Sequence, residues 1–70
     1  MNAEEIGRLE TYLKKIFNSD AMEVRRVPNK DDMVELHQRD EFLGTIYRDN
    51  EDGDLSYQVN MAILDIDLDE

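Results

Sequence analysis

The sequence has 70 residues, no cysteine and a formal net charge of −10. A chain of this length buries only about 60% of its unfolded surface, and no disulfide can reinforce its core. No apolar run approaches the roughly 20 residues that a membrane-spanning helix needs, and the polar stretch at 2–5 is not typical of a signal peptide. These features predict one small cytoplasmic domain over residues 1–70, with no membrane partner.

The negative charge lies in the second half of the chain. Residues 1–30 carry six Lys or Arg and five Asp or Glu, whereas residues 31–70 carry two and thirteen. Such a surface repels nucleic acid and anionic lipid, so we expect neither as a partner. The acidity favours either simple solubility or a face that docks on a basic protein.

The first predicted element is an amphipathic helix from Asn2 to Asn18. Asn2 is a good N-cap, and Glu5 three residues later completes a capping-box pattern. Gly7 lowers helix propensity by about 1 kcal/mol relative to Ala, and we interpret it as a site of close packing on the sheet. Apolar side chains at helical spacing form one stripe, which consists of Ile6, Leu9, Leu13, Ile16 and Phe17.

Three strands with turn-forming residues between them follow the helix. Pro28 and Asn29 favour a turn after the first strand, and Gly53 suits the polar loop that follows the third. Alternating apolar and polar residues mark the strands themselves. The predicted strands are Ala21–Val27, Met33–Gln38 and Phe42–Arg48.

The last predicted element is a strand from Leu55 to Glu70, the longest apolar pattern in the chain. Apolar residues occupy odd positions up to Ile63 and even positions from Leu64 to Leu68. Alternation of this kind indicates a strand with one buried face, and the change of phase indicates a bulge or a bend. We expect the segment beyond Ile63 to bend and pair with the first strand, which would partly close the sheet.

Antiparallel pairing of these strands gathers most of the apolar side chains on one sheet face. The registers that achieve this place Arg48 opposite Leu55, Gln38 opposite Phe42 and Val24 opposite Val34. The expected inner face carries Met22, Val24, Val34, Leu36, Phe42, Ile46, Leu55, Tyr57, Val59 and Met61.

The helix stripe is the natural cover for this inner face. We therefore predict an α+β fold, with one N-terminal amphipathic helix packed on a four-stranded antiparallel meander sheet that has a long bent last strand. The opposite face is mostly polar but includes a small apolar cluster, which is a candidate contact. With the aspartates of the last strand, the candidate protein-contact residues are Met33, Leu43, Tyr47, Asp65, Asp67 and Asp69.

Residues that could support catalysis or metal binding are scarce. His37 is the only histidine and is expected on the exposed face, so triads, zinc sites and thiol chemistry lack the partners they need. The loop Asp49–Asp54 resembles a calcium loop, but with Gly53 at the sixth position Arg48 and Val59 occupy the first and twelfth. We assign no catalytic residue, no cofactor and no metal ligand.

Three stretches, MNAEEI, EFLGTIYRDNEDGDLSYQV and MAILDIDL, resemble a short alphaproteobacterial family classed as a domain of unknown function. The resemblance covers nearly the whole chain and involves no catalytic motif. It implies a single small bacterial domain and carries no activity, cofactor or site residue.

The leading functional hypothesis is a non-enzymatic cytoplasmic protein-interaction module that binds another protein or its own copy. Two alternatives keep a protein partner: a regulatory or accessory subunit of an enzyme, and an acidic nucleic-acid mimic that binds a basic protein. An enzyme that works alone is a further alternative, for which the sequence offers no catalytic constellation.

Overall fold

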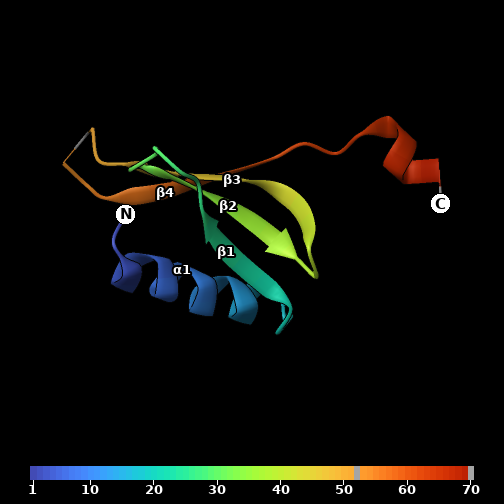
Figure 1. Ribbon diagram of the computed structural model, residues 1–70, viewed down its shortest axis with the longest axis horizontal. Coiled ribbons are helices and arrows are strands. Elements are labelled where there is room, and N and C mark those ends of the chain that lie inside the picture. Colours follow the sequence, from blue (N-terminus) through green and yellow to red (C-terminus); the bar gives the residue numbers. More distant parts are fainter. Residues whose placement is uncertain (52, 70) are drawn as a thin grey trace.

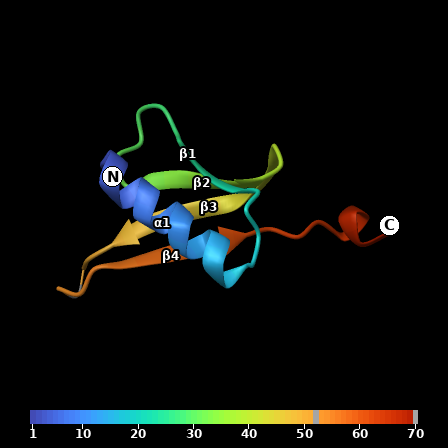
Figure 2. The same ribbon diagram turned by 90° about the horizontal axis from the view of Figure 1, so that it is seen from below.

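The computed structural model describes residues 1–51 and 53–69. Its elements are α1 (Ala3–Ile16), β1 (Met22–Arg26), β2 (Met33–Gln38), β3 (Glu41–Asp49), β4 (Ser56–Met61) and the short 3-10 helix η1 (Asp65–Asp69). The strands form one antiparallel sheet in the order β1-β2-β3-β4, and α1 lies against one face of it (Figures 1 and 2). The predicted α+β fold of one helix on a four-stranded meander is confirmed.

The predicted capping box begins α1. The Asn2 side chain accepts a hydrogen bond from the Glu5 backbone N–H at 2.8 Å, and Glu5 Oε1 accepts one from the Asn2 N–H at 3.2 Å. These bonds satisfy N–H groups that a helix start otherwise leaves unpaired. The helix ends at Ile16, where Phe17 bonds back to the Leu13 carbonyl and Asn18 adopts a left-handed φ of 52°.

The core lies between α1 and the first three strands. The helix backbone lies nearest β1, at one edge of the sheet. A helix about 10 Å wide cannot cover four strands spaced about 4.8 Å apart, so the inner face near β4 is left exposed. Leu55, Val59 and Met61 are therefore exposed, although we expected them in the core. The buried apolar side chains are Leu13, Met22, Val24, Val34, Leu36 and Ile46.

The β1–β2 and β3–β4 registers keep each side chain on its predicted face of the sheet, whereas the β2–β3 register changes at a bulge. Two pairs, Val24 with Leu36 and Arg48 with Tyr57, differ from the expected registers by two residues, a shift that preserves the sheet face. Between β2 and β3 the register slips after Leu36, so that His37 lies opposite Phe42.

The bulge corrects the predicted positions of three residues. Gln38 pairs with Glu41 rather than with Phe42, and Phe42 turns to the face that carries His37. Leu43 becomes the extra residue and packs against the core instead of facing outward. Gly44 follows the bulge at a close approach of two backbones, because a Cβ there would lie 2.2 Å from the Asn60 carbonyl oxygen.

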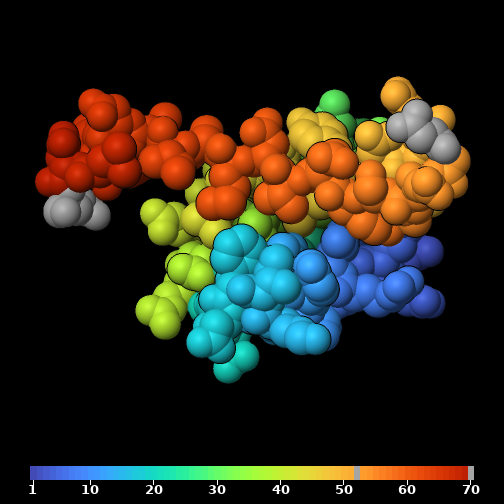
Figure 3. Space-filling model, turned by 180° about the vertical axis from the view of Figure 1, so that it is seen from behind, coloured from blue at the N-terminus to red at the C-terminus, as the bar shows by residue number. Residues whose placement is uncertain are grey.

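The last strand is shorter than predicted and does not close the sheet. Its pairing with β3 ends at Met61, opposite Gly44. Residues 62–69, which end in η1, extend from the body as a C-terminal arm (Figures 1 and 3). Within the described chain β1 pairs with β2 alone. Apolar alternation marks a segment suited to a strand, but a strand also needs a neighbouring backbone, and β3 offers none beyond its bulge.

Candidate protein-interaction surface

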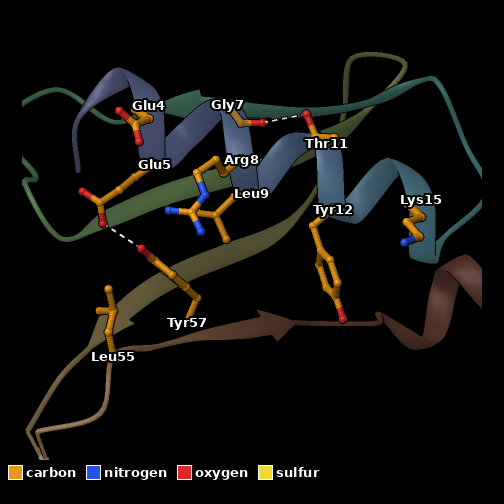
Figure 4. Close-up of a pocket in the computed structure, with 10 residues that line it drawn as sticks. All are labelled: Glu4, Glu5, Gly7, Arg8, Leu9, Thr11, Tyr12, Lys15, Leu55 and Tyr57. Carbon is orange, nitrogen blue, oxygen red and sulfur yellow. Dashed lines mark hydrogen bonds between the residues drawn. The ribbon is translucent and has the colours of Figure 1, made fainter.

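An open groove of about 930 Å³ separates α1 from β4. It follows from the position of α1, which covers β1 and leaves the β4 side of the inner face uncovered. Figure 4 shows helix side chains on one wall and the start of β4 on the other. The lining residues are Glu4, Glu5, Gly7, Arg8, Leu9, Thr11, Tyr12, Lys15, Leu55 and Tyr57.

Glu5 closes one end of the groove by joining the helix to two strands. Its Oε2 accepts a hydrogen bond from the Tyr57 hydroxyl at 2.7 Å and lies 3.1 Å from Arg48 Nε. The hydrogen bond from Tyr57, followed by the one from the Asn2 backbone, holds the pKa of Glu5 below its ordinary value. The same bond, together with desolvation, raises the pKa of Tyr57. Glu5 therefore fixes the first turn of α1 against β3 and β4.

The groove has an apolar floor that continues past its open end. Leu9 and Tyr57 pack against the core, whereas Tyr12 is 59% exposed above the end of β4. Val59 and Met61 are exposed on β4, and Ile16 and Phe17 are exposed at the end of the helix. Several exposed apolar side chains thus lie on the elements that border the groove, and clusters of exposed apolar side chains are typical of an interaction site.

Gly7 lines the helix wall and makes no close packing contact. A Cβ built at Gly7 meets no atom within 4 Å, so our interpretation of this glycine as a packing site is wrong. Its missing side chain widens the groove instead. No contact within the described chain requires a glycine at this position of the helix.

The helix wall also carries basic side chains. Arg8 points from α1 toward the strand wall and Lys15 lies at the opposite end from Glu5 (Figure 4). Neither forms an ion pair with another residue that the structure describes, whereas Lys14 lies 3.5 Å from Glu10. The groove thus combines an apolar floor with two basic and two acidic side chains, and one of the acidic groups, Glu5, is paired with Arg48.

The C-terminal arm presents the opposite combination. The predicted contact residues Asp65, Asp67 and Asp69 lie on η1 and are exposed. The arm also carries four apolar side chains that are 59–72% exposed: Ile63, Leu64, Ile66 and Leu68. The arm is therefore acidic and apolar at once.

The open sheet face brings together only part of the predicted apolar cluster. Met33 lies opposite Tyr47, as expected, and Tyr47 is exposed. Leu43 is withdrawn from this face by the bulge. Met33 and Tyr47 thus form a small pair rather than a cluster of three.

His37 is buried, although we expected it to be exposed. Phe42 packs edge-on against its ring at 5.5 Å, and Nε2 lies 2.9 Å from Glu35 Oε1, so that only 8% of the residue is exposed. The bulge is the cause, because it carries Phe42 onto this face.

Within residues 1–51 and 53–69, no three His, Asp or Glu side chains gather in a way that could hold a metal ion. Asp52, part of the loop compared above with a calcium site, lies outside the described residues. None of the helices among these residues is long and apolar enough to cross a membrane.

A family model described as "protein of unknown function (DUF3126)" matches residues 5–67. The chain belongs to this family. The match spans all but the first two residues of α1, the four strands and the first part of η1. No curated protein and no solved structure matches the chain.

Sequence reasoning about this DUF3126 protein missed the basic wall of the groove. A signal was present, because Arg8, Tyr12 and Lys15 recur at helical spacing beside the core stripe. That the stripe borders a groove depends on the lateral position of α1 on the sheet, which periodicity does not encode.

Proposed function

We propose that this DUF3126 protein is a non-enzymatic, cytoplasmic protein-interaction module that docks through the surface shared by α1 and β4. The observation that supports it is the uncovered apolar surface around the groove, together with the exposed apolar side chains of the arm. A bacterial, alphaproteobacterial source belongs to the same proposal and is supported by the resemblance of the sequence.

The physical basis of the proposal is the cost of leaving this surface in water. Burial of apolar surface is worth about 25 cal/mol per Å², so covering the groove would stabilise a domain whose described residues include six buried apolar side chains. Small domains without disulfides commonly gain stability by association. The aspartates of η1 would meet basic groups of the partner at the rim, where charge sets orientation and association rate.

The exposed aspartates also favour a second candidate, a mimic of nucleic acid. Asp65, Asp67 and Asp69 place three carboxylates within the five residues of η1. A mimic would compete with nucleic acid for a basic protein, and its binding would weaken steeply as salt is added. A regulatory or accessory subunit of an enzyme would use the same α1–β4 surface, with the enzyme as its partner.

Site-specific photo-crosslinking in the native host tests the proposal. A benzoylphenylalanine in place of exposed Tyr12 is expected to give a discrete crosslinked protein species. The same group in place of Lys30, on the turn between β1 and β2, is the matched control and is expected to give none. Absence of a discrete species at Tyr12 would contradict the proposal, and a species at Tyr47 alone would move the interface to the open sheet face.

A further inference from the structure

We infer that the α1–β4 groove receives the C-terminal arm, residues 62–69, of a second copy of this chain. Two copies would exchange their arms reciprocally across a twofold axis. This inference rests on the proposed function and identifies the partner as the protein itself.

The chemistry of the arm complements that of the groove. The groove offers exposed apolar side chains and the cations Arg8 and Lys15 on its helix wall. The arm offers exposed apolar side chains that alternate with aspartates at positions 65, 67 and 69. The lining also contains two acidic side chains. Glu5 is paired with Arg48, and Glu4 lies on the same turn of the helix. Docking would therefore bury apolar surface and bring opposite charges together at the rim.

The glycine at position 7 is easier to explain if the groove is occupied than if it is empty. A glycine inside a helix costs about 1 kcal/mol relative to Ala, and no described contact needs it here. Because Gly7 has no side chain, it leaves room for a docked segment on the helix wall of the groove.

The direction of the arm favours a second copy over the arm's own groove. β4 runs toward the Tyr12 end of the groove, and residues 62–69 continue away from the body in that direction (Figures 2 and 4). To enter its own groove, the chain would have to reverse immediately after Met61. Residues 62–64, where that reversal would have to lie, are Ala, Ile and Leu, none of which is a typical turn residue.

The two edges of the sheet differ in a way that also favours this arrangement. On β1, the Val24 N–H donates to Glu10 Oε2 at 2.9 Å, so a helix side chain occupies the middle of that edge. On β4, no described strand pairs with the outer edge. The arm of a twofold-related copy would run antiparallel to β4 and would reach the groove past this unobstructed edge. The twofold axis closes the exchange at two copies, because the arm of each copy then lies in the groove of the other.

Light scattering across a concentration series tests the inference with two variants that spare the core. Ile66→Asp with Leu68→Asp alters the exposed arm, and Gly7→Leu fills the groove where the structure has open space. The unaltered chain is expected to dimerise, and each variant to raise the dimer Kd at least about tenfold. Ala3→Leu on the exposed start of α1 and Tyr47→Ser on the open face are matched controls that should leave the Kd unchanged.

Mixing the two variants separates exchange between copies from docking within one copy. The Gly7→Leu chain keeps a normal arm, and the Ile66→Asp, Leu68→Asp chain keeps a normal groove. Exchange predicts that the mixture forms a heterodimer through one arm at a concentration where neither variant dimerises alone. A wild-type protein that stays monomeric, or a mixture that stays monomeric, overturns the inference.

A disulfide test locates the contact, because the chain has no native cysteine. Chains with Thr11→Cys in the groove and with Asp67→Cys in the arm are expected to crosslink to each other on mild oxidation, and Lys30→Cys is expected not to crosslink with Asp67→Cys. A dimer that forms without the Thr11–Asp67 crosslink uses another face and overturns the inference. A groove that crosslinks in cells to a different protein also overturns it but leaves the proposed function standing.

Discussion

Glu5 connects three parts of the molecule through one carboxylate. It caps the helix through Asn2, accepts the Tyr57 hydroxyl and faces Arg48, so a single side chain couples the first turn of α1 to β3 and β4. These interactions favour the ionised carboxylate and lower its pKa in the folded protein.

The lowered pKa gives the stability contributed by Glu5 a definite pH dependence. The unfolded chain takes up this proton first, near the ordinary value of 4.5, so the contribution is present above that pH and is lost as pH falls through the folded pKa. Glu5→Gln should destabilise the protein at neutral pH and lose less stability than the wild type on acidification. Urea denaturation at several pH values measures both, with Glu4→Gln on the exposed face as control. Parallel pH profiles for wild type and Glu5→Gln would contradict the prediction.

Gly7 and Gly44 form a pair with opposite expected responses to alanine. Gly7→Ala adds a Cβ in open space on a helix and should stabilise the protein by about 1 kcal/mol. Gly44→Ala drives a Cβ against the Asn60 carbonyl and should destabilise it by roughly 1–3 kcal/mol, because two paired backbones must move apart. Thermal melts measure both changes. A neutral Gly44→Ala would mean that the β3–β4 register differs from the one described.

At the scale of elements, Leu13 is the one side chain of α1 that is fully buried among the described residues. It is 4% exposed and Ile6 and Leu9 pack beside it, whereas its neighbour Tyr12 is 59% exposed. Leu13→Ala should cost about 2–5 kcal/mol, a large share of the 5–15 kcal/mol that stabilises a typical domain. Tyr12→Ala is the control and should change monomer stability by less than about 0.5 kcal/mol. If Leu13→Ala melts like the wild type, α1 does not dock as described.

Local patterns predicted the elements far better than they predicted their pairing. The capping residues Asn2 and Glu5 fix the helix start, and alternation fixes β2 exactly. The bulge before Gly44 reverses Phe42 and Leu43, and an isolated glycine within a strand was its only local signal. The extent of β4 depends on where β3 ends its pairing, which is a property of two strands together.

The candidate surface was harder to predict for a similar reason. The sequence named the aspartates of the arm as candidate contacts, and the structure shows that they are exposed. The groove exists because α1 lies nearest β1, and that position depends on several apolar contacts of the core acting together.

At the scale of the whole molecule, the principal extents of 42 × 23 × 23 Å reflect the arm projecting from the body (Figure 3). If copies exchange arms, association is linked to folding, and the melting temperature should rise with protein concentration. Ile66→Asp with Leu68→Asp should abolish that dependence and leave the low-concentration melting temperature nearly unchanged. Scanning calorimetry over a dilution series measures both. A concentration-independent wild-type melt would contradict the prediction.

The Glu10 carboxylate on β1 has a consequence for the number of chains that can join. In polymer chemistry, a unit with two reactive ends propagates a fibre, whereas a unit with a single reactive end stops growth after one coupling. Glu10 occupies the middle of the β1 edge and leaves β4 as the reactive end. As far as its sheet edges are concerned, the protein is thereby a monofunctional unit, in which one helix carboxylate acts as a chain terminator against strand-by-strand aggregation.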